Sequence, residues 1–235
     1  MRYTAILVLA LLASAALRAQ EPPRPVRMVI ATERLASLAD AARSFALLRV
    51  DFAKGQRAAF AGPNGYVYVL AGKVRIGSDA ARTLSVGEAA YIRAGDAAEF
   101  SNAGSAHATL LHFMLVAGSG PATGYSGSAK VRELHRTAAI PAMQNGPYEF
   151  SLTKVTSPPK VKPPMHHRSG AAIYYVLDGA ATLHMESASE PRKAGAVQFE
   201  PSTFVHTWEN SGSVPLVILQ ANISREGTPE IVFLR

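Results

Sequence analysis

Short apolar runs alternate with short polar breaks along most of the chain. The runs are rich in Val, Ile, Tyr, Phe and Leu, and the breaks contain Gly, Pro, Asn and Ser. Runs of this kind, separated by turn residues about every 8–12 positions, are typical of antiparallel sandwiches and barrels. No long helical pattern alternates with them, which argues against a parallel α/β sheet. The pattern therefore predicts an all-β chain.

Three blocks of the sequence occur twice. The sequence YVLAG at residues 68–72 returns as YVLDG at residues 175–179, an offset of 107. The pattern F-x-L-x-[KR]-V occurs at residues 45–50 and again at 150–155, an offset of 105. A third block has an offset of 108: Gly87, Phe100 and Asn102 recur as Gly195, Trp208 and Asn210. A nearly constant offset indicates an internal repeat, so we expect two copies of one β unit.

The repeat sets the expected domain boundaries. The two units cover residues 45–116 and 131–235, and the segment between them, residues 117–130, is rich in Gly and Ser, as flexible linkers are. Residues 20–44 precede the first unit and contain the Pro-rich sequence EPPRPVR, which favours an extended arm. We therefore expect an arm followed by two small antiparallel barrels in tandem.

The first 19 residues have the pattern of an export signal. Arg2 precedes an apolar run from Ala5 to Leu17, and small residues follow, with cleavage expected after Ala19. The run is shorter than the roughly 20 residues that a membrane-spanning helix needs. We expect residues 1–19 to be a signal peptide and the mature protein to be periplasmic or secreted, without a stable membrane anchor.

Composition and charge remove several classes of function. The 235 residues carry 24 Lys and Arg against 17 Asp and Glu, a formal charge of +7, but the charges form no block. Nucleic-acid binding would call for clustered basic residues interleaved with aromatics, and no such stripe occurs. There is no cysteine, so disulfides, thiolate metal sites and cysteine nucleophiles are excluded. A hydrophobic content of 48% argues against disorder.

The second unit contains a recognisable motif. From Gly195 to Asn210 the sequence reads G-x5-P-x-T-x2-H-x3-N. It resembles the second conserved motif of the cupin superfamily, in which a glycine takes the place of Thr203. The family fold is a jelly-roll β-barrel, and a chain with two of them is a bicupin. The resemblance covers about residues 45–116 and 150–222, and it implies two tandem cupin-type jelly-roll barrels, the first of them degenerate.

The first cupin motif is only partly kept. In the family it reads His-x-His, three or four residues, Glu, six residues, Gly, and the stretch that ends at Gly179 resembles it. Counting back from Gly179 places the family's glutamate at Ala172. With three intervening residues the histidine pair falls on His166 and Arg168. The family's metal is usually held by three histidines and one glutamate, so this chain keeps at most part of the set.

The other spacing gives a different pair. With four intervening residues the pair falls on Met165 and His167, so either spacing keeps one histidine of this motif. Adjacent residues face opposite sides of a regular strand, and only a bulge would present both histidines. The resemblance implies that His166, His167 and His206 are the candidate ligands of one divalent metal ion, Fe, Mn, Ni or Zn. A third ligand could come from His184, Glu186, Gln198 or Glu200.

Arg168 and Trp208 are the candidate substrate-binding residues. If Arg168 takes the second histidine's place, a permanent cation stands where a metal would bind. Two unit charges 4 Å apart repel by about 4 kcal/mol at an effective dielectric of 20. Such a pocket would prefer a carboxylate or phosphate, held by the guanidinium. Trp208 follows His206 by two residues and shares its strand face, where it could stack on a planar ligand or simply pack in the core, as Phe100 would in the first unit.

The first unit lacks candidate ligands. The same counting places its four ligand positions on Ala59, Ala61, Gly65 and Ala98, none of which binds a metal. We therefore expect the first unit to be structural and to pack against the second.

Three functional hypotheses follow. The first is an exported bicupin that binds a small, anionic molecule in its second barrel, with weak or altered metal binding. The second is a metal-dependent oxygenase that uses His206 with His166 or His167. The third is a metal-free isomerase or epimerase with His206 as proton carrier, which needs a tyrosine or carboxylate facing that histidine. No nucleic-acid partner is expected, and the exposed edges of two barrels favour a homodimer.

Overall fold

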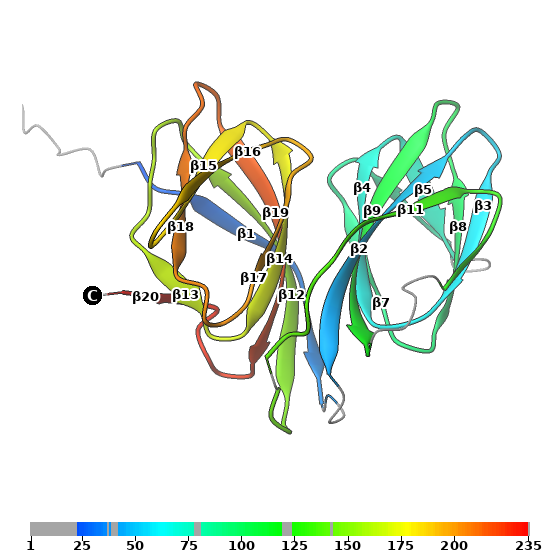
Figure 1. Ribbon diagram of the computed structural model, residues 1–235. Coiled ribbons are helices and arrows are strands. Elements are labelled where there is room, and N and C mark those ends of the chain that lie inside the picture. The colour runs from blue at the N-terminus through cyan, green and yellow to red at the C-terminus, as the bar shows by residue number, and fades with distance from the viewer. Residues whose placement is uncertain are drawn as a thin grey trace, which may run out of the picture.

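The apolar runs form β-strands throughout the part of the chain that the computed structural model describes, which is residues 23–36, 38, 42–77, 81–118, 124–141 and 143–234. These residues contain twenty strands in four five-stranded antiparallel sheets, and no helix occurs among them. Figure 1 shows two β-barrels side by side. The all-β prediction with two tandem barrels is confirmed. The predicted signal peptide, residues 1–19, lies outside the described residues, and no apolar helix long enough to span a membrane is found in the described part.

The first barrel consists of two sheets with the strand orders β10-β3-β8-β5-β6 and β11-β2-β9-β4-β7. Its strands are β2 (Arg43–Phe52), β3 (Arg57–Ala61), β4 (Gly65–Ala71), β5 (Lys73–Ile76), β6 (Arg82–Ser85), β7 (Ala89–Ile92), β8 (Ala97–Asn102), β9 (Ala108–Ala117), β10 (Tyr125–Gly127) and β11 (Lys130–Arg136).

The second barrel repeats this arrangement with the strand orders β16-β15-β18-β13-β20 and β1-β12-β19-β14-β17. Its strands are β1 (Val26–Leu35), β12 (Tyr148–Ser157), β13 (His166–Arg168), β14 (Ala171–Asp178), β15 (Ala180–Met185), β16 (Ser189–Lys193), β17 (Val197–Glu200), β18 (His206–Asn210), β19 (Leu216–Arg225) and β20 (Ile231–Phe233).

The two barrels exchange strands, which corrects the predicted domain boundaries. Strand β1 lies in the segment expected to be an extended arm, residues 20–44, yet it pairs with β12 of the second barrel. Strand β11 falls almost wholly within the predicted second unit, residues 131–235, but it pairs with β2 of the first barrel. Hydrophobic patterning predicts that a segment is a strand, whereas its partner depends on which sheet edge lies within reach. The predicted boundaries therefore separate strands from the barrels in which they pair.

The glycine of the duplicated motif ends a strand in each barrel. Gly72 and Gly179 have φ angles of 71° and 84°, in the left-handed region that glycine tolerates. A Cβ on Gly179 would come within 2.8 Å of the Pro215 carbonyl oxygen, and one on Gly72 within 2.6 Å of the His107 carbonyl oxygen. Both the backbone angle and the close approach therefore require glycine at this turn.

A shared core holds the two barrels together. One continuous apolar cluster contains Phe45 of β2 and Phe150 of β12, both fully buried, with ring centroids 6.4 Å apart. Tyr66 of β4 donates a hydrogen bond of 2.6 Å from its hydroxyl to the Phe150 carbonyl oxygen across the interface. Burial of each phenylalanine contributes about 1.5–3 kcal/mol. The sheets that carry these residues lie back to back at the centre of Figure 1, so each barrel supports its neighbour.

Candidate functional site

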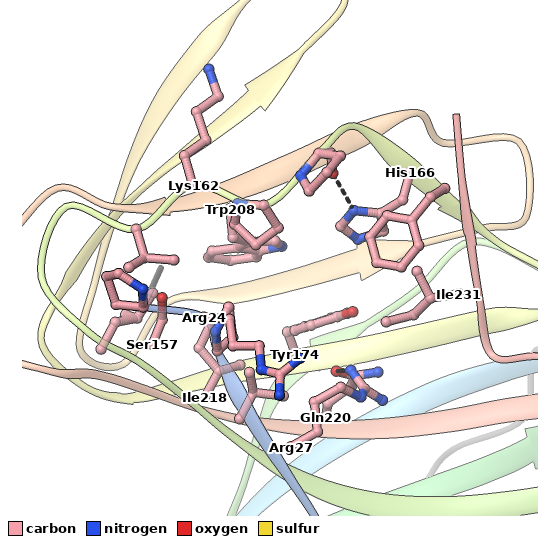
Figure 2. A pocket seen from close by; sticks show the side chains of 18 of the residues that line it. Arg24, Arg27, Ser157, Lys162, His166, Tyr174, Trp208, Ile218, Gln220 and Ile231 are labelled. Atoms are coloured by element: carbon pink, nitrogen blue, oxygen red, sulfur yellow. Dashed lines mark hydrogen bonds between the residues drawn. The ribbon is translucent and has the colours of Figure 1, made fainter. Parts of the chain in front are cut away.

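The second barrel contains a cavity of about 680 Å³. Strands β12, β13, β14, β18, β19 and β20 contribute to its wall, and residues 23–27 cover part of it (Figure 2). Most of the lining is apolar, including Trp208, Tyr174 and Ile218. Its charged side chains are Arg24, Arg27, Lys162 and Arg168, and none of the described residues that line it is an aspartate or glutamate. The cavity thus combines apolar walls with positive charge.

Strand β13 decides which candidates face this cavity. His166 and Arg168 are buried, with 6% and 3% of their surface exposed, and both line the cavity. His167, between them, is only half-buried, does not line the cavity, and has its Nδ1 3.0 Å from the Arg168 carbonyl oxygen. The regular alternation of a strand therefore puts Arg168 on the inner face and His167 on the other. The structure brings His166 and His206 together, with ring centroids 4.6 Å apart, and leaves His167 apart from them.

A buried polar network surrounds Glu200, which is fully buried. Arg168 donates from Nε to Glu200 Oε2 over 3.0 Å, and Trp208 donates from Nε1 to Oε1 over 2.7 Å. The Nε2 atom of His206 lies 2.7 Å from the same Oε1 but is not aligned with it as a hydrogen bond. One carboxylate thus joins three of the residues that the sequence singles out.

Glu200 stands directly opposite Ala172 in the pairing of β14 with β17. Ala172 is the position at which the cupin motif has its glutamate. The barrel therefore has a carboxylate next to this position, but it comes from the neighbouring strand. The sequence analysis gave Glu200 as one of four possible third ligands and did not say which of the four point into the barrel. Only the register of the two strands brings residues 172 and 200 together.

The electrostatics of this network favour the ionised pair. Burial by itself would raise the pKa of the Glu200 carboxyl, but the Arg168 guanidinium, with contributions from His206 and Trp208, holds that pKa below its usual value. Burial also lowers the pKa of Arg168, partly offset by Glu200. An arginine stays charged in proteins, so the barrel holds a guanidinium–carboxylate pair out of water.

His166 and His206 are held in the same way. The Nδ1 atom of His166 lies 3.0 Å from the Pro164 carbonyl oxygen, and that of His206 lies 2.9 Å from the Phe204 carbonyl oxygen. A carbonyl only accepts, so each Nδ1 carries the proton. Burial lowers the pKa of His166 to about 4. His166 is therefore neutral near pH 7, with the lone pair of Nε2 available.

Several buried polar atoms near the cavity have no hydrogen-bond partner among the described residues. They include Nη1 of Arg168 and the hydroxyl of Tyr174. Both residues line the cavity, and the Arg168 guanidinium carbon lies 5.2 Å from the centre of the Tyr174 ring. A buried donor without a partner costs about 1–3 kcal/mol. A ligand that accepts these hydrogen bonds would recover that cost.

The donor set does not fit the three-histidine, one-glutamate metal site of the family. Within the described residues, no group of three His, Asp or Glu side chains is arranged to hold a metal ion. Glu200 already accepts hydrogen bonds from Arg168 and Trp208, and the guanidinium adds a positive charge beside His166 and His206. Two imidazoles next to a fixed cation are a poor site for a divalent ion.

The other suggested third ligands do not reach the cavity. Glu186 is exposed, and Gln198 donates to the Phe199 carbonyl oxygen. His184 lies between Ser189, at 2.8 Å from Nδ1, and Glu209, at 2.7 Å from Nε2. His184, Ser189 and Glu209 belong to the neighbouring strands β15, β16 and β18, and none of the three lines the described cavities. They form a cross-strand hydrogen-bonded group rather than a catalytic pocket.

In the first barrel, apolar residues occupy the positions that correspond to His166 and His206. Phe60 faces Ala98 in the pairing of β3 with β8, as His166 faces His206 in the second barrel. Ala59 and Ala61, where counting placed two ligand positions, lie on the exposed face of β3. The counting was wrong by one residue because the segment between β3 and β4 differs in length from its counterpart. Its conclusion stands, since Phe60 and Ala98 bind no metal either.

Comparison with known proteins agrees with this architecture. Residues 153–221, most of the second barrel, match the Cupin domain family. No curated protein matches the chain in sequence.

Solved structures resemble both barrels at once. AerE from Microcystis aeruginosa has a TM-score of 0.57 at 15% identity, covering 86% of this chain and 98% of its own. Bacillus subtilis oxalate decarboxylase, described with Mn(II) centres, has a TM-score of 0.58 at 13% identity over 88% and 79% of the two chains. A cupin 2 conserved barrel domain protein from Leptotrichia buccalis has a TM-score of 0.50 at 17% identity over 83% and 89%. Residues 153–221 therefore belong to the Cupin domain family, and the whole chain has the two-barrel fold of these solved structures.

Proposed function

We propose that the second barrel binds a small organic anion without a resident metal ion and that Arg168 is its anchor. The observation that carries the proposal is the Arg168 side chain. It is 3% exposed, it lines the cavity, and its Nη1 has no hydrogen-bond partner among the described residues. Glu200 occupies Nε and neutralises the charge in the empty barrel, while the outer part of the guanidinium is left to a carboxylate.

The cavity walls suggest the rest of the ligand. Trp208 and Tyr174 stack with ring centroids 5.6 Å apart, and aliphatic side chains from β12 and β19 complete the surface. Small-molecule sites usually combine such apolar walls with a few polar groups that fix orientation. A carboxylate attached to a flat apolar body matches both features.

The test uses the protein's own fluorophore. Trp208 is the only tryptophan of the chain and lines the cavity, so its emission should change when a ligand binds. We expect phenylacetate to shift the emission and saturate, and phenylacetamide, which has the same shape without the charge, to bind at least tenfold more weakly. R168M alone would leave Glu200 unpaired, so the R168M/E200Q pair is the variant to compare, and it should bind phenylacetate at least tenfold more weakly. Equal binding of acid and amide would overturn the proposal.

A metal-dependent oxygenase is the second candidate, favoured by His166 and His206. Both rings present Nε2 after Nδ1 is held by a carbonyl, as metal-ligating histidines do. The discriminating measurement is metal content by mass spectrometry of tag-free protein, with H206A alongside. Metal near one per chain that disappears in H206A would support the oxygenase. Metal well below one per chain, unchanged by reloading, would support the metal-free binder.

Proton-transfer chemistry is the third candidate. It needs a carboxylate or tyrosine facing His206, and Glu200 lies 2.7 Å from that ring. Its test is deuterium exchange into a bound carboxylic acid, with E200Q as the comparison. Exchange that E200Q abolishes would favour an isomerase or epimerase over a binding protein.

Export is part of the proposal. It is supported by the apolar run that follows Arg2, and fractionation of cells that express the full chain would test it. Recovery of the protein in the periplasm or medium, with residues 1–19 removed, is the expected result.

A further inference from the structure

We infer that the bound anion is a 2-hydroxy acid with an aromatic ring, whose carboxylate meets Arg168 and whose hydroxyl donates to Nε2 of His166. This inference rests on the proposed anion-binding function and adds the chemical class of the ligand. It comes from three groups that line one cavity: a cationic donor, a neutral acceptor and an aromatic wall.

The acceptor is His166. Its Nδ1–H is donated to the Pro164 carbonyl oxygen, as the dashed line in Figure 2 shows, so Nε2 keeps its lone pair. A second proton on this buried ring would place two cations side by side, since Arg168 lies two residues away on the same face of β13 and lines the same cavity. A neutral Nε2 accepts a hydrogen bond but offers none. The ligand group that it meets must therefore be a donor.

The donor must lie close to the carboxylate. His166 and Arg168 are two residues apart on the inner face of β13, so their Cα atoms are about 7 Å apart and their side chains lean into the same cavity. A hydroxyl on the carbon next to a carboxylate is the donor that stays nearest to it. The ligand then spans the two side chains with one functional unit.

The ring of the ligand has a prepared wall. Trp208 donates its N–H to Glu200 and stacks on Tyr174, so it offers a ring face rather than its polar edge to the cavity. In Figure 2 Trp208 lies between Lys162 and His166, so the aromatic wall stands between two polar lining residues. A flat ring attached to the hydroxy acid would lie against this wall.

The charge of the lining selects against amino acids. An ammonium group is also a donor next to a carboxylate, but it would be buried beside the Arg168 guanidinium, whose carboxylate partner Glu200 is already engaged, against a largely apolar lining. Repulsion between like charges in such a site disfavours it. A hydroxyl donates equally well and carries no charge.

The first experiment needs no variant. Phenylacetate and each enantiomer of mandelate, which adds only the 2-hydroxyl, are titrated against Trp208 fluorescence at pH 7, with mandelamide as the uncharged control. One enantiomer should bind about three- to tenfold more tightly than phenylacetate, the gain expected of one added hydrogen bond. Phenylglycine should bind more weakly than phenylacetate. If none of the acids binds, the proposed function fails, whereas equal binding of phenylacetate and both mandelates overturns the present inference alone.

The second experiment assigns the preference to His166. H166F is the matched variant, because Phe60 occupies the corresponding position of the first barrel and the fold accepts a phenylalanine there. Within H166F, the ratio of mandelate affinity to phenylacetate affinity should fall to about one, because phenylalanine cannot accept the hydrogen bond of the 2-hydroxyl. A preference that survives in folded H166F, as judged by circular dichroism, contradicts the assignment. If H166F does not fold, H166Q, whose side-chain carbonyl can still accept, should keep part of the preference, and a complete loss there overturns it.

Discussion

The two barrels repeat the same unit but use their interiors differently. In the first, Phe60 and Ala98 face each other, Ile92 stands opposite Gly65, and the buried His112 ring packs against Phe60 with ring centroids 4.6 Å apart, so side chains fill this end of the barrel. In the second, the corresponding pairs are His166 with His206 and Ala172 with Glu200. The strand pairing is the same while the contents differ. The unit thus tolerates either a packed interior or a polar cavity.

One glycine allows the packing of the first barrel. Gly62 follows Phe60 by two residues, as Arg168 follows His166. A Cβ on Gly62 would come within 2.7 Å of the Phe60 ring. The missing side chain at position 62 therefore makes room for the phenylalanine that fills the first barrel.

The polar interior contributes less to stability than apolar packing would, as the proposed binding function predicts. Replacing a buried ion pair with apolar groups of similar size is often neutral or stabilising, whereas removing one partner is strongly destabilising. Here Arg168 and Glu200 are both at most 4% exposed in their side chains. The following predictions test this contrast between the barrels.

The largest effect is expected from removing one partner of the pair. E200A leaves the Arg168 guanidinium buried without its carboxylate, and we expect a loss of about 3–5 kcal/mol in the free energy of unfolding. Urea denaturation measures it. The matched control is R168M/E200I, which gives position 200 the isoleucine of the first barrel. Its free energy of unfolding should lie within about 1–2 kcal/mol of the wild-type value or above it. Equal destabilisation by both variants would refute the contrast.

A second prediction converts the ligand site toward a metal site. R168H replaces the guanidinium with a third imidazole beside His166 and His206, with Glu200 freed from its ion pair. We expect R168H to retain Zn²⁺ or Mn²⁺ near one per chain after dialysis, while R168M, which also lacks the cation, retains much less. Mass spectrometry of both variants decides it. Stoichiometric metal in the wild type would instead show that Arg168 does not prevent binding.

A third prediction concerns the buried histidine of the first barrel. Burial lowers the pKa of His112 to about 3, and its Nε2 has no hydrogen-bond partner within the described part of the chain. The unfolded chain therefore binds more protons between pH 6.5 and 3, so stability falls as the pH falls through that window. For this histidine alone the loss is about 2 kcal/mol from pH 7 to pH 5.

The matched variant for this histidine comes from the second barrel. His112 faces Val67, as Gln220 faces Tyr174, so H112Q inserts the residue that the other barrel uses. Thermal melts from pH 7 to pH 4 should show a smaller acid loss for H112Q than for the wild type. The remaining slope includes His166, which H166F removes. An equal fall in melting temperature between pH 7 and pH 4 for H112Q and the wild type would contradict the prediction.

The smallest effect is expected at the surface. Lys162 lines the cavity but is exposed, in contrast to buried Arg168. K162A should weaken phenylacetate binding by about twofold, and raising the salt concentration should erase the difference, because exposed charges are screened. Fluorescence titration at two ionic strengths measures it. A loss of affinity as large as that of R168M/E200Q would show that exposed Lys162, rather than buried Arg168, anchors the ligand.

Local sequence predicted much of the fold. Apolar alternation gave the strands, and the repeat gave two barrels, because side-chain patterning and turn glycines such as Gly72 and Gly179 act over a few neighbouring residues. The exchange of β1 and β11 between the barrels was not predictable in this way. Which edge a strand joins depends on segments about 80 or more positions away, such as β12 for β1 and β2 for β11.

The candidate site divides along the same line. The sequence by itself predicted that His206 belongs to the second motif and that the first motif holds either His166 with Arg168 or Met165 with His167, because motif spacing is a property of the chain. Only the tertiary structure decided that Arg168 faces inward and His167 does not, and that Glu200 stands opposite Ala172. The physical reason is register: a shift of one residue turns every side chain of a strand to its other face, and register is fixed by partners distant in sequence.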